Sequence, residues 1–126
     1  MSYPTDRKYT KEHEWIGADG TIGITHYAQE SLGDIVFVDL PKVGAEIAAG
    51  KTFGTVESVK AVSDLYAPAT GTVAAVNAEL ATAPEKVNKD AHGAWMIKVT
   101  LKDPAELSGL LSAADYEKFV SEEGAH

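Results

Sequence analysis

The chain has 126 residues, 44% of them hydrophobic and 24% charged, which is typical of one soluble globular domain spanning residues 1–126. Its 19 acidic and 11 basic residues give a formal net charge of -8, which disfavours nucleic acid and anionic membrane surfaces as partners and favours basic ones. It contains no cysteine, which excludes a thiol nucleophile, a disulfide framework and a thiolate metal site. No apolar run approaches the ~20 residues that cross a bilayer, so we expect a cytoplasmic protein without a membrane partner.

The chain begins with a predicted hairpin and a short helix. Residues 14–16 and 21–24 are β-prone and flank the turn residues 17–20, a pattern that favours a hairpin. Thr25 can then cap a short helix over residues 26–32.

The rest of the chain is predicted to form short strands followed by a helical tail. β-Prone or alternating segments predict strands over 34–40, 52–59, 62–66, 72–76 and 94–101. Helical segments are predicted over 78–81, 104–110 and 113–121, with a loop or short helix over 83–92 and a frayed end over 122–126. Many short strands with a helical tail indicate a mainly-β sandwich.

One short sequence pattern occurs twice. Residues 54–59 begin Gly-Thr-Val and end in Val, and residues 71–76 do the same. The two segments are either equivalent strands of a pseudo-symmetric sandwich or a chance likeness in a region rich in Gly, Thr and Val.

The sequence contains no recognisable catalytic set. The histidines, at positions 13, 26, 92 and 126, lack the spacing of metal ligands, and no nucleophile elbow or phosphate-binding glycine loop is present. We therefore expect a non-catalytic binding or carrier protein and not an enzyme.

Lys60 lies between two β-prone stretches with no Gly, Pro or Asn between them. The tip of the predicted hairpin falls on residues 59–61, which would project the lysine into solvent. Local chemistry leaves two interpretations: a lysine that protects an edge strand from aggregation, or an attachment point.

The segment around Lys60 resembles the lipoylation hairpin of the glycine cleavage H-protein family, which runs Glu-Ser-Val-Lys-Ala-x-Ser-Asp and corresponds to residues 57–64. Residues 9–15 resemble the Tyr-x-x-x-His-Glu-Trp block of that family, and the likeness extends to about residue 120. Matching segments are 23–25, 28–29, 32–41, 76–77 and 93–99, with Pro84 and Asn88.

This resemblance implies a fold of the biotinyl/lipoyl type, a β sandwich (barrel-sandwich hybrid) with short helices and a C-terminal helix. It also implies lipoic acid in amide linkage to Lys60. The chemistry then belongs to the cofactor. The implied partners are glycine decarboxylase (P protein), aminomethyltransferase (T protein), dihydrolipoyl dehydrogenase (L protein) and a lipoate ligase or lipoyltransferase. We expect a monomer that carries the aminomethyl group of glycine from the P protein to the T protein.

The resemblance also implies roles for other residues. Glu57, Val59 and Ala61 would be read by the lipoylating enzyme, and the last two lack the flanking methionines of biotin domains. A further set would receive the folded-back arm: Glu14, Ile24, Ser31 and Asp64.

Two departures from the family pattern stand out. Some relatives have histidine where this chain has Ser31, which bears on how the loaded arm is protected. Residues 90–95 read Asp-Ala-His-Gly-Ala-Trp where relatives usually read Asp-Pro-Tyr-Gly-x-Gly-Trp, so the shape of this shorter loop is open.

Three alternatives to a glycine cleavage carrier stay open. One is a lipoyl or biotinyl domain of a 2-oxo acid dehydrogenase or carboxylase, although the chain has no Ala/Pro-rich linker. Another is an H-like relay that donates lipoate to other enzymes. The last is an unmodified module in which Lys60 is a plain surface lysine.

Overall fold

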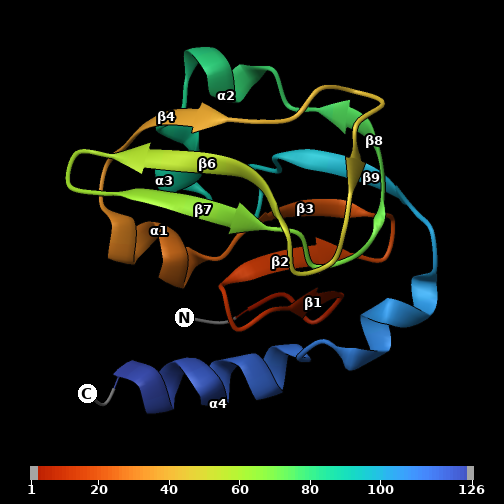
Figure 1. Ribbon diagram of the computed structural model, residues 1–126. Helices are drawn as coiled ribbons and strands as arrows, with labels where there is room; N and C mark the ends of the chain where they lie inside the picture. The colour runs from red at the N-terminus through yellow and green to blue at the C-terminus, as the bar shows by residue number, and fades with distance from the viewer. Residues whose placement is uncertain (1–2, 125–126) are drawn as a thin grey trace.

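A computed structural model describes residues 3–124, with side chains as far as residue 122. Figure 1 shows two β-sheets and a C-terminal helix that runs beneath the first strand. The larger sheet has the order β1 (Arg7–Tyr9), β2 (Glu14–Gly17), β3 (Thr21–Ile24), β9 (Ile97–Leu101), β8 (Gly71–Val76) and β5 (Glu46–Ile47). The smaller sheet has the order β4 (Ile35–Asp39), β6 (Thr52–Ser58) and β7 (Val62–Tyr66).

Helices occupy the connections and the tail. They are α1 (His26–Leu32), α2 (Glu79–Thr82), α3 (Lys86–Lys89), a 3-10 helix (Pro104–Gly109) and α4 (Ala113–Gly124). No helix in the described part of the chain is long and apolar enough to cross a membrane. The mainly-β sandwich with a helical tail is therefore confirmed.

The first hairpin and its capped helix form as predicted. Trp15 of β2 pairs with Gly23 of β3, and the N–H of Ala28 donates to Thr25 Oγ1 (3.2 Å) at the start of α1. At the other end of the chain, the N–H of Asp115 donates to Ser112 Oγ (3.2 Å), so Ser112 caps α4.

Several predicted boundaries were wrong. The short strands β1 and β5 were missed, and β9 begins at Ile97, three residues later than predicted. The segment predicted as a helix from Pro104 is a 3-10 helix. α4 continues to Gly124, so the predicted frayed end at 122–124 is helical, while residues 125–126 lie outside the described residues.

The two sheets bury a shared core. The smaller sheet contributes Val38, Val56 and Leu65, which pack in one apolar cluster with residues of the larger sheet such as Val73 and Ile97. Burial of this area supplies the main driving force for folding. The core thus joins the sheet that carries Lys60 to the rest of the molecule.

The repeated Gly-Thr-Val pattern marks similar positions in the two sheets. Gly54 in β6 and Gly71 in β8 each face a backbone carbonyl of a neighbouring strand, so closely that a Cβ atom could not be accommodated. The valine two residues later, Val56 or Val73, is 1% exposed in both strands. This geometry favours equivalent strands over chance likeness.

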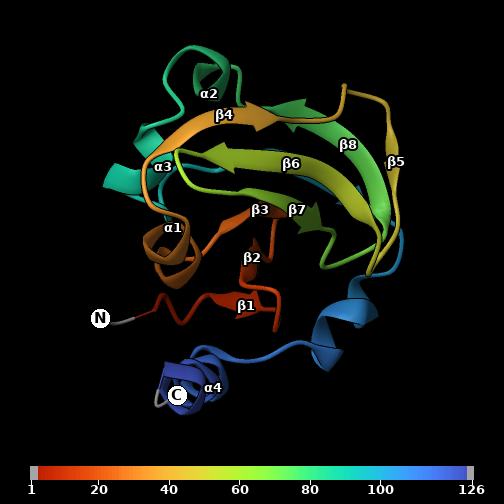
Figure 2. The ribbon, with the colours of Figure 1, turned by 60° about the vertical axis from the view of Figure 1, so that its left-hand side comes forward.

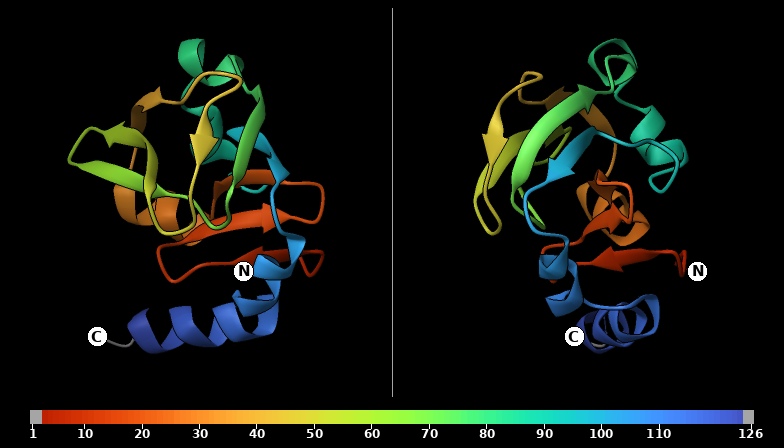
Figure 3. Two further views of the ribbon diagram at one scale, coloured as in Figure 1. Left: turned by 45° about the vertical axis from the view of Figure 1, so that its right-hand side comes forward. Right: turned by 90° about the vertical axis from the view of Figure 1, so that its right-hand side faces the viewer.

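α4 is held against β1 by a second cluster of buried side chains. Tyr116 is fully buried and stacks on Tyr9 with ring centroids 4.9 Å apart, and its hydroxyl lies 2.7 Å from Thr25 Oγ1. Figure 3 shows α4 on the far side of β1 from the β6–β7 hairpin. The helical tail therefore leaves the Lys60 hairpin uncovered.

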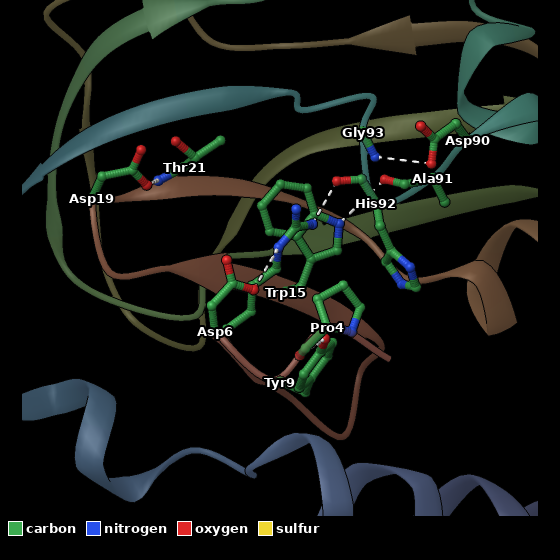
Figure 4. Close-up of polar contacts among 11 residues, drawn as sticks. Pro4, Asp6, Tyr9, Trp15, Asp19, Thr21, Asp90, Ala91, His92 and Gly93 are labelled. Carbon is green, nitrogen blue, oxygen red and sulfur yellow. Dashed lines mark hydrogen bonds and ion pairs between the residues drawn. The ribbon is translucent and has the colours of Figure 1, made fainter. Parts of the chain in front are cut away.

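The loop that departs from the family pattern is held against β2 (Figure 4). Trp15 Nε1 donates to the Ala91 carbonyl (3.2 Å), and the Arg7 guanidinium lies 4.1 Å above the Trp15 ring while donating to the His92 carbonyl. The N–H of Gly93 donates to Asp90 Oδ1 (3.2 Å), which closes the loop. The loop is thus anchored without the proline and tyrosine of its relatives.

Candidate functional site

The β6–β7 hairpin projects from one end of the molecule, as Figures 1 and 3 show. The last cross-strand pair of the two strands is Glu57 with Val62, and the N–H of Ser58 then donates to the Ala61 carbonyl (2.8 Å). Val59 and Lys60 are left as the two residues of the tip, and both are exposed. The structure therefore places Lys60 where the sequence predicted it.

The side chain of Ser58 organises this tip. Two-residue hairpin loops normally use turns that need positive φ angles, but among the described non-glycine residues only His13 has a positive φ. Ser58 Oγ instead accepts from the N–H groups of Lys60 (3.3 Å) and Ala61 (3.1 Å). The N–H groups of Lys60 and Ala61, which make no hydrogen bond in the β-ladder, thus find an acceptor within the turn.

The tip is also fastened to the segment that follows α1, seen below the hairpin in Figure 2. The N–H of Val59 donates to the Asp34 carbonyl (3.0 Å). A Cβ atom built on Gly33 would lie 3.5 Å from Lys60 Cε, so the lysine stem rests against this glycine. Gly33 has φ 82° and ψ -155°, a conformation essentially restricted to glycine. The backbone under the Lys60 stem therefore carries no side chain at Gly33 and turns sharply there.

Asn88 of the α3 region fixes that same segment from the other side. Its Oδ1 accepts from the N–H of Ile35 (2.8 Å), and its Nδ2 donates to the Gly33 carbonyl (2.8 Å) and to Gln29 Oε1 (3.0 Å). One amide side chain thus binds the end of α1 to the start of β4. It supports the corner on which the hairpin tip rests.

The residues predicted to be read by a lipoylating enzyme surround Lys60. Val59 and Ala61 are exposed on either side of it, and Glu57 is half-buried in β6. Glu57 pairs with Phe37 of β4 and with Val62 of β7, so the three side chains share the outer face of the smaller sheet.

Glu14, predicted to receive the arm, is enclosed. Its side chain accepts from Thr10 Oγ1 (2.8 Å) and from the N–H of Tyr66 (3.3 Å), the last residue of β7. Glu14 is 2% exposed, and burial raises the pKa of its carboxyl from 4.5 to about 8, although its two hydrogen bonds act against this. Glu14 is therefore a buried acid and not a surface one.

The other predicted arm-docking residues occupy different surroundings. Ile24 pairs directly with Glu14 across β2 and β3 and is 2% exposed, so these two residues are buried side by side. Asp64 on β7 and Ser31 on α1 are both exposed. The hydrogen bond from the Tyr66 N–H links Glu14 to β7, the strand that also carries Asp64. No described contact links Ser31 to Glu14 or to Asp64.

Sequence reasoning missed the residues that hold the tip: Ser58, Gly33, Asp34 and Asn88. A signal existed for Ser58, because serine beside a tight turn commonly bonds to the turn backbone. Asn88 carried no local signal, since its partners lie 53 to 59 residues away in sequence.

Chemically, the site is an exposed primary amine on a braced turn. Lys60 has no hydrogen-bonded acid or base among the described side chains. Among the described residues, no three His, Cys, Asp or Glu side chains are placed to hold a metal ion. This arrangement suits covalent attachment of a group that must reach beyond the protein surface.

Comparisons with known proteins point to one family. The family model for the glycine cleavage H-protein matches residues 7–123. The glycine cleavage system H protein of Koribacter versatilis is 72% identical over 126 residues, covering all of both chains, and that of Acidobacterium capsulatum is 64% identical over 129 residues, again covering all of both. The crystal structure of the Mycobacterium marinum H protein matches with a TM-score of 0.84 at 40% identity, over 97% of this chain and 99% of that one. The chain therefore belongs to the glycine cleavage H-protein family, the lipoyl carriers of the glycine cleavage system.

Proposed function

We propose that Lys60 carries lipoic acid in amide linkage on Nζ, and that the loaded chain visits the enzymes of glycine cleavage in turn. The observation that carries this proposal is the position of Lys60 at an exposed hairpin tip braced by Ser58 and Asp34. A carrier needs a rigid base and a mobile arm, because each partner must find the arm at a defined origin.

The residues present fit a lipoyl group. The amine of Lys60 is exposed, so an enzyme can bring an activated lipoyl ester or mixed anhydride to it. Nζ then forms the amide bond, the leaving group departs with its electron pair, and the displaced proton goes to solvent. When attached, the lipoyl group supplies a redox-active disulfide, and this chain has no cysteine that could exchange with it.

The partners we propose are the decarboxylase (P protein), the aminomethyltransferase (T protein), the dihydrolipoyl dehydrogenase (L protein) and a lipoate ligase or lipoyltransferase. Family membership supports these partners, and the net charge of -8 favours basic docking surfaces on them. We further propose that the chain is a non-catalytic, cytoplasmic monomer.

For the arm, we propose a resting place along β7 toward Glu14 and Ile24, with Asp64 and Ser31 at its exposed edges. A carboxylate close to an amine-bearing group is electrostatically favourable. The raised pKa of Glu14 adds a condition, since a positively charged group nearby would favour loss of its proton.

The attachment site is tested by intact mass and peptide mapping after co-expression with a lipoate ligase. We expect wild type and Lys51→Arg, which alters another exposed lysine, to gain the mass of one lipoyl group on the peptide that contains Lys60. Lys60→Arg keeps the charge and should gain nothing. A lipoyl group that persists in Lys60→Arg, or never forms on wild type, would refute the assignment.

A further inference from the structure

Apolar side chains are exposed around Lys60. Five large hydrophobic residues of the described chain are exposed, and four of them lie at the tip end of the smaller sheet: Val36 (53%), Phe37 (49%), Val59 (69%) and Val62 (66%). The fifth, Val43, lies outside that sheet. Exposed apolar groups gathered in this way are typical of an interaction surface.

Strand register places the centre of this group on one face. Phe37, Glu57 and Val62 are directly opposite one another across β4, β6 and β7. The next row on the same face is Asp39, Thr55 and Asp64. The intervening residues Val38 and Val56 are 6% and 1% exposed and point into the core, so these two rows point outward.

The outer face therefore combines an apolar pair with carboxylates. Phe37 and Val62 flank Glu57, and Asp39 and Asp64 form the edge of the patch away from the tip. No salt bridge involves these three carboxylates among the described residues. A surface that complements this face presents an apolar hollow bordered by arginine or lysine.

The length of the arm identifies which partner needs this face. An enzyme that acts on the far end of a lipoyllysine can work at a distance from the hairpin tip, because the lipoyl group extends the lysine side chain. An enzyme that acylates Nζ has to bring its active site within one lysine length of the tip backbone, about 6 Å, and must therefore contact the adjoining sheet.

We propose that the outer face of β4, β6 and β7, centred on Phe37 and Val62 and bordered by Asp39, is the docking surface for the enzyme that acylates Lys60. The inference rests on the proposed function, because it requires Lys60 to be the acylated residue. It extends recognition from the residues beside Lys60 to a neighbouring strand, β4, that is remote in sequence.

The test measures lipoylation kinetics of the unmodified protein with a bacterial lipoate ligase, ATP and lipoate, using intact mass as the readout. For Phe37→Ala/Val62→Ala we expect the KM for the protein to rise about tenfold, with kcat at saturation changing much less. Asp39→Lys should also raise KM, and added salt should raise the wild-type KM. Val43→Ala and Glu122→Lys, matched in type but away from this face, should leave KM unchanged, and thermal unfolding confirms that each variant is folded.

Three results would overturn the proposal. The first is an unchanged KM for the double variant while wild type is lipoylated on Lys60, which leaves the proposed function intact. The second is an equal rise of KM in glycine–bicarbonate exchange by the lipoylated variant, which would assign the face to the decarboxylase. The third is concentration-dependent self-association that Phe37→Ala abolishes, which would assign it to a second copy of this chain. Failure of wild type to be lipoylated on Lys60 would instead refute the proposed function.

Discussion

At the scale of single residues, the buried carboxyl of Glu14 is the least expected feature. It lies between β2 and the end of β7, where Thr10 and the Tyr66 backbone donate to it. Removing a carboxylate from water costs free energy, and here that cost exceeds the gain from two hydrogen bonds, so the pKa is raised to about 8. At neutral pH, the protonated form therefore predominates.

This pKa predicts a pH-dependent stability. Between pH 4.5 and about 8 the unfolded chain has released the Glu14 proton and the folded chain still holds it, so stability contributed by this group is lost as pH rises. The free energy of unfolding of wild type should fall relative to Glu14→Gln, by at most about 1.4 kcal/mol per pH unit. Urea unfolding of both proteins from pH 5 to pH 8 measures the difference, and a flat difference would show that Glu14 ionises normally.

At the scale of elements, the β6–β7 hairpin depends on Ser58 for its tip. Ser58→Ala removes the acceptor for the N–H groups of Lys60 and Ala61. We expect these two amides to exchange with solvent several-fold faster, at a cost of about 1 kcal/mol, while Ser58→Thr keeps the acceptor and the protection.

Hydrogen exchange followed by NMR is the measurement for this hairpin prediction. Ser63→Ala on β7 is the matched control, because the one hydrogen bond of Ser63 Oγ within the described part of the chain goes to the Asp64 carbonyl (3.4 Å) and not to the tip. Equal exchange in Ser58→Ala and wild type would mean that the backbone hydrogen bonds of Ser58 and Val59 hold the tip without the Ser58 side chain.

Elements with local signals were predictable from the sequence. The β2–β3 hairpin has turn residues at its tip, and α1 has its threonine cap. β1 and β5 were missed because three and two residues carry too little pattern, and their pairing with β2 and β8 is decided by tertiary contacts. α4 extends further than its pattern predicts, since the residues beyond 121 follow a helix already anchored by Tyr116.

The residues of the candidate site also differ in whether the local sequence predicts them. Lys60 and its neighbours follow from a contiguous motif, whereas the supports from Gly33, Asp34 and Asn88 require a folded chain. The enclosure of Glu14 was equally inaccessible, because it is created by strands that are distant in sequence.

At the scale of the whole molecule, the hairpin that carries Lys60 is set apart from the packed core and the helical tail. Two sheets share one core, α4 fastens the N-terminal strand, and the hairpin that carries Lys60 projects away from both (Figure 3). The amide bond proposed for Lys60 would remove one positive charge and make an already acidic chain more acidic. The proposed partners would therefore present basic surfaces to this acidic chain.

The central claim is that this chain, lipoylated on Lys60, serves glycine cleavage. Its most direct test is exchange of labelled bicarbonate into glycine by the P-protein decarboxylase. The lipoylated chain should support exchange in proportion to its lipoyl content, and Lys60→Arg taken through the same lipoylation should support none above background. A lipoylated chain that supports no exchange, yet donates its lipoyl group to another lipoyl domain, would contradict the account and identify the chain as a relay.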